Sequence, residues 1–154
     1  MKALLLIFFI ATPFLTYTQV TKSYHLNGKL KSEANYKDGK LDGQLFGWYE
    51  NGQLKSERFY KDGKNIGVHR GWSENGVLTY QAEFNNDGYW HGSIQHWFEN
   101  GQKRVESLAI NGAFDGIQKS WYENGQQSTE VKFINGEKLS QKCWDIKGRE
   151  IECQ

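Results

Sequence analysis

The stretch Trp48–Gly67, WYENGQLKSERFYKDGKNIG, recurs along the chain at a nearly constant interval. A fixed period of this length is typical of repeat proteins, in which each copy forms one small structural unit. The intervals between successive turn glycines are 24, 24, 25, 24 and 23 residues. These glycines are Gly28, Gly52, Gly76, Gly101, Gly125 and Gly148. The chain from residue 19 onward is therefore predicted to consist of six copies.

Each copy is predicted to form a β-hairpin. An Asn-Gly step between two runs that carry aromatic residues is a strong hairpin signal, because both residue types tolerate a positive φ. We interpret residues 50–52, Glu-Asn-Gly, as a three-residue loop with glycine in the left-handed position. This loop places Trp48 opposite Leu54.

The alternation of side chains along a strand predicts which residues share a face. Trp48, Leu54 and Tyr60 fall on one face, and Lys55 and Glu57 fall on the other. A single layer with one charged face is expected to curl toward its aromatic face. The repeats would then line a trough with Trp48, Trp72, Trp97, Trp121, Tyr36, Tyr60, Phe84 and Phe133.

The predicted fold class is all-β: tandem β-hairpin repeats of about 24 residues that form one elongated, curled antiparallel sheet. Residues 19–154 would make a single domain of six hairpin copies. The last copy, residues 143–154, is expected to act as a cap, since the end copies of a repeat array are atypical. The third copy has one extra residue, Asn85 or Asn86, which we interpret as a β-bulge at a strand end.

Residues 1–18 have the features of a signal peptide. Lys2 supplies the positive start, residues 3–11 form the apolar core, and small residues precede a predicted cut near Gln19. A membrane anchor is the alternative, but the apolar run is too short to span a bilayer and Pro13 interrupts it. We therefore expect an exported protein, either periplasmic or secreted.

The charge balance constrains the class of partner. The formal net charge is +1, and removal of Lys2 with the signal peptide leaves equal numbers of basic and acidic residues. A neutral domain lacks the basic surface that nucleic acid binding requires. Docking on anionic lipid is not favoured for the same reason, although contact with a membrane surface stays open. We expect a monomer with an unidentified protein or peptide partner.

Two cysteines, Cys143 and Cys153, flank the last turn. An exported chain meets oxidising conditions, in which such a pair can close. The predicted register places the two side chains on one face in diagonal positions. A disulfide that staples the terminal hairpin and a pair of free thiols are therefore both open, and the disulfide is favoured.

The sequence contains no arrangement of residues typical of catalysis. His25, His69, His91 and His96 occupy four different columns of the repeat, so stacking of the copies does not bring them together as a metal site would need. The recurring glutamates are explained by repetition, and no nucleophile recurs beside a base. We expect no enzymatic activity, no cofactor and no bound metal.

Two aromatic features are candidates for binding. Tyr49, Phe98 and Tyr122 form a stripe that the predicted register places on the outer, charged face. Such a stripe marks a binding patch or shields the backbone between strands, and both interpretations stay open. The second feature is Trp90 with its neighbours at 89 and 91, in a connection where the third copy departs from the others.

Tyr89-Trp90-His91 is the only aromatic cluster outside the repeat columns. Recognition residues are commonly found on loops of a rigid scaffold. Trp90 combines a large apolar surface with an indole N–H, which suits an interface anchor.

The chain resembles the variant MORN repeat family, in particular the YwqK-type proteins of bacteria. The resemblance is carried by WYENGQLKSERFYKDG at residues 48–63, WFENGQKRVE at 97–106 and WYENGQQSTE at 121–130. Some relatives are named antitoxins of toxin–antitoxin or immunity pairs, and classical MORN repeats have been linked to membrane lipids and protein scaffolds.

We therefore expect an exported module for protein–protein interaction with an antitoxin-like or immunity-like role. The alternative is an envelope structural or surface-associating protein that contacts lipid or glycan.

Overall fold

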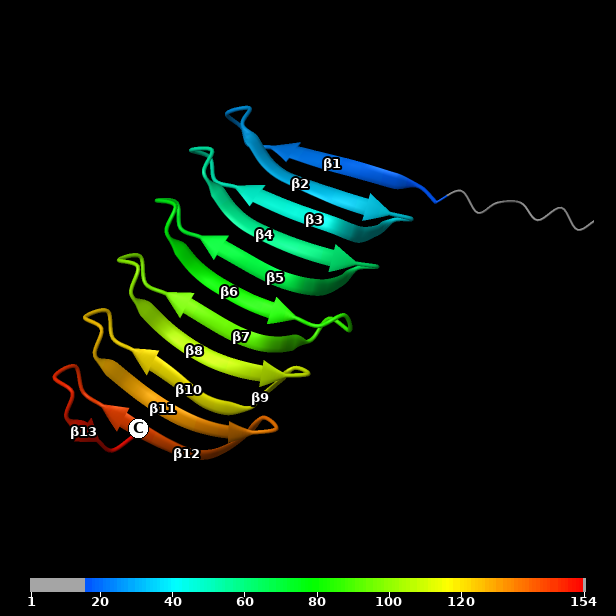
Figure 1. Cartoon of the computed structure of the whole chain (residues 1–154). Coiled ribbons are helices and arrows are strands. Elements are labelled where there is room, and N and C mark those ends of the chain that lie inside the picture. Colours follow the sequence, from blue (N-terminus) through cyan, green and yellow to red (C-terminus); the bar gives the residue numbers. More distant parts are fainter. Residues whose placement is uncertain (1–15, 154) are drawn as a thin grey trace, which may run out of the picture.

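The computed structural model describes residues 16–153, and within this range the chain is all β with no helix. Thirteen strands form one open sheet whose order follows the sequence, with each strand antiparallel to its neighbours and β9 paired only with β8 (Figure 1). The predicted fold class is confirmed. The strands are β1 (Thr18–Tyr24), β2 (Leu30–Lys37), β3 (Lys40–Trp48), β4 (Leu54–Lys61), β5 (Lys64–Trp72), β6 (Leu78–Phe84), β7 (Trp90–Trp97), β8 (Lys103–Ile110), β9 (Ala113–Phe114), β10 (Gly116–Trp121), β11 (Gln127–Ile134), β12 (Glu137–Trp144) and β13 (Glu150–Ile151).

The Glu-Asn-Gly turn has the predicted three-residue form. Trp48 pairs with Leu54, and the amide of Gly52 donates to the carbonyl oxygen of Tyr49 at 2.9 Å. Gly52 has a φ of 95°, which a side chain would strain. Asn51 closes the loop, because its Oδ1 accepts a hydrogen bond from the amide of Gln53 at 2.8 Å.

The strand after this turn carries a β-bulge that the sequence analysis missed. Gly47 pairs with Ser56 and Trp48 pairs with Leu54, so Lys55 has no partner in the register. One extra residue on one strand reverses the alternation of side chains beyond it. The same skip occurs in every complete copy. The skipped residues are Lys31, Lys55, Thr79, Arg104 and Ser128.

The predicted assignment of the faces is consequently wrong. Glu57 pairs with Phe46, whose ring lies 5.8 Å from that of Trp48 on the same face. The tryptophans therefore lie among the charged side chains, and the Tyr60 column lies on the opposite face. We call the tryptophan side of the sheet the outer face and the Tyr60 side the inner face.

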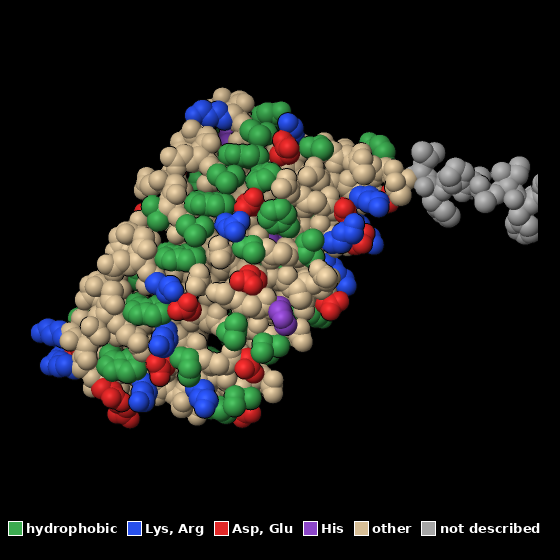
Figure 2. Space-filling model, viewed as in Figure 1, with side chains coloured by type: hydrophobic (Ala, Val, Ile, Leu, Met, Phe, Trp, Pro, Cys, Tyr) green, Lys and Arg blue, Asp and Glu red, His purple; other side chains and the backbone are tan. Residues whose placement is uncertain are grey.

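The outer face carries rows of ion pairs between adjacent strands. Figure 2 shows rows of hydrophobic side chains with Lys, Arg, Asp and Glu side chains between them. Arg70 Nη1 lies 3.0 Å from Glu57 Oε2, and Lys61 Nζ lies 2.9 Å from Asp42 Oδ2. The tryptophans of this face are half-buried. Charged pairs and half-covered tryptophans together form a surface that no second layer covers.

The inner face holds the most buried side chains. Ala82 and Ala109 are fully buried, Ile94 is 5% exposed, and the three pack together with Tyr80, Phe84 and Phe114 against them. A single layer shelters side chains only on the face toward which it bends, so the inner face is the concave one. The expected curled sheet is thus present, but it curls toward the Tyr60 column and away from the tryptophans.

The bend occurs at a mid-strand glycine in the first four copies, and Ser140 takes this place in the fifth. Between the pairs Glu57–Arg70 and Phe59–Ile66, β5 has three residues and β4 has one, and Gly67 in this segment has a φ of 64°. Two surplus residues force one strand to arch over its partner. Gly43, Gly92 and Gly116 recur at this position with φ values from 103° to 117°.

The turns at the opposite end of the hairpins have two residues, as in Asp38-Gly39, where both φ values are positive. In the third copy the extra residue lengthens this turn. The amide of Asn85 donates to the carbonyl of Tyr89 at 2.9 Å, and that of Gly88 donates to the carbonyl of Asn85 at 3.1 Å. The extra residue therefore lies in a three-residue turn and not at the end of β6, where the sequence analysis placed it.

The two ends of the sheet bear on the predicted processing. Residues 1–15 of the predicted signal peptide lie outside the described residues. Residues 16–18 belong to the described part, where Thr18 pairs with Lys37 and the amide of Tyr17 donates to Asp38 Oδ1 at 2.9 Å. A cut near Gln19 would remove these contacts of the first turn. At the other end a disulfide joins Cys143 to Cys153, which is the pairing favoured by the sequence.

Candidate binding groove on the inner face

A continuous row of rings crosses the inner face. Tyr60 and Phe84 come from the repeat column, and His69, Trp90 and Phe114 fill the positions between the columns. Successive ring centroids lie 4.4–6.5 Å apart, within the range of favourable aromatic contact. The row comprises Tyr60, His69, Phe84, Trp90, Phe114 and Phe133.

Small side chains beneath the row let the large rings approach one another. Ala109 occupies the place that Tyr60, Phe84 and Phe133 hold in other copies, and it is fully buried. Its small size lets Trp90 stack on Phe114, with the two centroids 6.3 Å apart and the planes 21° from parallel. The copy that lacks an aromatic residue in this column is thus where two rings of the row come closest to parallel stacking.

The row borders a hollow of about 370 Å³ that is open to solvent. Rings form its walls, and Arg58 and Asn65 supply its polar groups. Phe84 and Trp90 lie on one side of it and Tyr60 on another. The lining residues are Arg58, Tyr60, Asn65, His69, Tyr80, Phe84 and Trp90.

His69 forms the base of this hollow and is only 4% exposed. Its Nε2 lies 2.9 Å from the carbonyl oxygen of Phe59 and 3.2 Å from the amide nitrogen of the same residue. The carbonyl belongs to the segment where the bulge breaks the ladder between β4 and β5. Burial lowers the pKa of His69, and the nearby Arg58 lowers it further. His69 is therefore a neutral structural side chain at pH 7.

A second hollow of about 510 Å³ lies on the other side of Tyr80. Its polar groups include Arg104 and two glutamates, Glu99 and Glu123. The lining residues are Thr79, Tyr80, His96, Trp97, Phe98, Glu99, Arg104 and Glu123. Burial lowers the pKa of His96, with a further contribution from Arg104. For tyrosine the charged form is the deprotonated one, so burial raises the pKa of the Tyr80 hydroxyl. Because Tyr80 lines both hollows, they are adjacent on the inner face, and we call the two hollows together with the aromatic row the groove.

The structure separates the three residues of the predicted Trp90 cluster. Trp90 is the first residue of β7, not a loop residue as predicted, and it is 39% exposed in the aromatic row. Tyr89 lies in the turn, where a Cβ added at Gly112 would meet its ring at 3.3 Å. His91 Nδ1 lies 3.2 Å from Asn111 Oδ1 in that same neighbouring turn. Trp90 thus belongs to the groove, and its two neighbours join adjacent copies.

The stripe of Tyr49, Phe98 and Tyr122 does not lie on the charged face as predicted. Each residue directly follows a tryptophan of the outer face, and successive side chains alternate between the faces, so the stripe belongs to the inner face. The error has the same origin as the misplaced tryptophans, namely the bulge.

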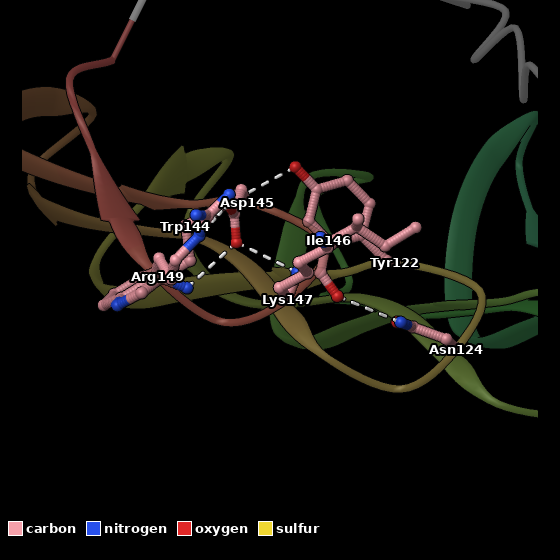
Figure 3. Close-up of polar contacts among 7 residues, drawn as sticks. All are labelled: Tyr122, Asn124, Trp144, Asp145, Ile146, Lys147 and Arg149. Carbon is pink, nitrogen blue, oxygen red and sulfur yellow. Dashed lines mark hydrogen bonds and ion pairs between the residues drawn. The ribbon is translucent and has the colours of Figure 1, made fainter.

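The tyrosines of this stripe also bond to the next copy. Tyr49 Oη donates to the carbonyl oxygen of Trp72 at 2.8 Å, and Tyr122 Oη donates to that of Trp144 at 3.0 Å (Figure 3). His25 reaches the carbonyl of Trp48 in the same way. These contacts favour the interpretation that the stripe shields and joins the backbone of adjacent hairpins.

The turn asparagines also link successive copies by hydrogen bonds. Asn51 Nδ2 donates to the carbonyl oxygen of Glu74 at 2.9 Å, and Asn124 Nδ2 donates to that of Ile146 at 3.1 Å (Figure 3). Asn27 and Asn100 make the same contact with the next copy. The Asn-Gly step therefore shapes its own turn and also fixes the spacing to the following one. Sequence reasoning found the first role and missed the second.

Within residues 16–153, no group of three or more His, Cys, Asp or Glu side chains is placed to hold a metal ion. The same range contains no apolar helix of the length that crosses a bilayer. What the described arrangement offers is an open aromatic groove with a few polar groups.

Comparison with known families accounts for the repeats. Four segments match the family described as MORN repeat variant: residues 20–38, 41–62, 66–86 and 114–135. Together they make up more than half of the chain. The chain belongs to this family. MORN repeats are generally repeat modules that bind proteins or membranes. No curated protein matches the chain.

The MORN matches leave out residues 87–113, which follow the third match. This interval contains Trp90 and Ala109, the two positions that make the groove differ from a regular MORN array. The part of the repeat protein that departs most from its family is thus the part that builds the stacked rings.

Proposed function

We propose that this MORN protein is an exported, YwqK-like binding module that recognises a protein partner through its inner-face groove. In this proposal Trp90 is the main anchor and the protein has an antitoxin-like or immunity-like role. It acts as a monomer, without a cofactor and without catalysis, and does not bind nucleic acid.

The observation that carries the proposal is the exposed side of the aromatic row. Trp90 is backed by Phe84 and Phe114 and still exposes 39% of its surface. An aromatic side chain held rigidly by its neighbours loses little conformational entropy on binding, and such residues dominate binding energies at protein interfaces. The concave shape of the face adds enclosure, which a flat surface lacks.

A pair of tryptophans on opposite faces tests the proposal. Trp90→Ala and Trp121→Ala remove the same side chain from the inner and outer faces, and Trp121 lines neither hollow of the groove. The purified variants would be used to capture proteins from the exported fraction of the source organism, and each partner found would be measured by titration. We expect Trp90→Ala to weaken binding at least tenfold and Trp121→Ala to leave it within about threefold. The reverse pattern would place the interface on the outer face.

The alternative function is association with a lipid or glycan surface in the envelope. It draws support from the outer face, where half-buried tryptophans lie among lysines; Lys103 Nζ, for example, lies 5.9 Å from the ring centroid of Trp121. Tryptophan beside lysine suits the boundary between an apolar layer and water. Co-sedimentation with vesicles that contain about a third of anionic lipid tests this function, and Trp121→Ala should then be the damaging variant.

A further inference from the structure

Two residues of the second copy differ from their counterparts at the same place in the groove. Arg58 occupies a position where the other copies have a small, buried residue. Asn65 occupies the position that is Trp90 in the third copy and Phe114 in the fourth. The counterparts of Arg58 in the other copies are Ala34, Ala82, Ser107 and Val131, all of them buried. Both departures are polar and both line the 370 Å³ hollow.

Asn65 helps to explain why the hollow exists. Its short side chain replaces the large ring that fills the equivalent site in the third and fourth copies, so space remains beside Tyr60. Arg58 is exposed and enters none of the ion pairs found in residues 16–153. A guanidinium group therefore borders the space with its donors free.

The electrostatics of the two hollows differ. The residues around the first hollow include Arg58 and no acidic side chain. Those around the second include Arg104 together with Glu99 and Glu123, which offset its charge. The charge of Arg58 reaches into the hollow. It adds to the lowering of the His69 pKa by burial, and it partly offsets the rise that burial causes in the pKa of Tyr80. Only the first hollow attracts an anion.

We propose that this hollow binds an acidic side chain of an extended peptide segment, with the carboxylate paired to Arg58 and a neighbouring apolar side chain packed on Trp90. A guanidinium presents donors in a planar fork that matches a carboxylate, and the Asn65 amide supplies a further donor. This inference rests on the proposed function, because it places the partner in the same groove.

The length of the groove favours a peptide over a free small molecule. The aromatic row runs from β4 to β11, which at about 4.8 Å per strand spans roughly 29 Å. An extended chain of about nine residues covers this distance at about 3.3 Å per residue. Since the hollow is open to solvent beside this row, an internal segment of a chain can lie along the row and place one side chain in the hollow.

The test uses a displayed library of random twelve-residue peptides selected against the purified protein. We expect the selected peptides to share an Asp or Glu next to an aromatic or large aliphatic residue. Replacement of that acid by its amide should raise the Kd at least tenfold, measured by fluorescence anisotropy. Arg58→Gln should remove this difference between acid and amide, and Arg104→Gln, the matched control, should preserve it. Arg58 is exposed, so a thermal melt should show Arg58→Gln folded as the parent.

Three results overturn the inference. Selection may yield no peptide, the acid and its amide may bind within threefold of each other, or Arg104→Gln may act as strongly as Arg58→Gln. If the peptides lack an acid but still depend on Trp90, the carboxylate site fails and the inner-face function stands. If their binding is unaffected by Trp90→Ala, the inner-face function fails as well.

Discussion

The two faces of this sheet are built from the same repeat but differ in how deeply their side chains are buried and in their charge. On the inner face, small side chains such as Ala82 are fully buried beneath rings that touch across strands. On the outer face, tryptophans stay half-buried and lie among ion pairs such as Arg70 with Glu57. In a single layer the direction of bending therefore decides which aromatic column becomes core, and the size of the rings does not.

The largest effect of a core truncation should come from the inner face. Ile94 is 5% exposed and packs between Ala82 and Ala109, which cannot move in to fill a gap. Ile94→Ala should lower the free energy of unfolding by about 3 kcal/mol, the sum of lost burial and a residual cavity. Urea denaturation monitored by tryptophan fluorescence measures this change. Lys55→Ala, at an exposed bulge position, should stay within about 0.5 kcal/mol of the parent.

A truncation of the outer face should cost less although it removes more atoms. Trp97 is half-buried, and its environment is partly water in the folded state. Trp97→Ala should lower the free energy of unfolding by about 2 kcal/mol, below the roughly 3–5 kcal/mol that is usual for a fully buried aromatic. A loss larger than that of Ile94→Ala would mean that the outer face carries the core after all.

The link between neighbouring copies can be weakened or strengthened through one hydroxyl. Tyr122→Phe removes the hydrogen bond to the carbonyl of Trp144 and should cost about 1 kcal/mol. Phe98 occupies the equivalent site without a hydroxyl, so Phe98→Tyr should gain up to about 1 kcal/mol. Paired denaturation curves of the two variants test both signs. An unchanged free energy of unfolding in Tyr122→Phe would show that the hydroxyl does not stabilise the link between the copies.

The faces should also differ in the pH range over which they lose stability, and this effect should be the smallest. Burial lowers the pKa of His69 and His96 from the ordinary 6.5, so the unfolded chain takes up protons first. The inner-face contribution is complete above pH 6.5 and declines as the pH falls toward 5. On the outer face Lys103 lowers the pKa of Glu106 from 4.5, so its contribution is lost only at lower pH.

Denaturation midpoints measured from pH 7.5 to 3.5 separate these ranges. The double variant His69→Gln, His96→Gln should flatten the profile between pH 7 and 5. Glu106→Gln should flatten it only below about pH 4.5. If the double variant leaves the upper part of the profile unchanged, the histidines do not set it.

The loop and its pairing were predictable because local chemistry decides them. Asn51-Gly52 needs a particular turn, and this turn brings Trp48 opposite Leu54. The assignment of faces failed one step later, at Lys55, where the strand inserts a bulge. One unpaired residue inverts every later position, so a correct loop led to an incorrect trough. The residues at this bulge are Lys31, Lys55, Thr79, Arg104 and Ser128, and they share no residue type that would mark it in the sequence.

The groove itself was less accessible to sequence reasoning. Trp90 was identified as unusual, but its partner Phe114 lies 24 residues away, and the small Ala109 that lets the two rings stack gives no sign of this role in the sequence. What joins these residues is the curvature of the sheet, which depends on the mid-strand glycines and their surplus residues. The contacts between copies made by Tyr49 and Asn51 were missed for a similar reason, since their partners belong to the next turn.

The strict sequence order of the strands has a mechanical consequence. The first and last described strands lie at opposite ends of the array (Figure 1). The hydrogen bonds between antiparallel strands lie across the strands, so they point along the array's long axis. A force applied to the two ends therefore acts along these hydrogen bonds, and the strand pairs separate one after another. Such a protein would lengthen at low force in similar steps of about one hairpin each, and close again in the same order.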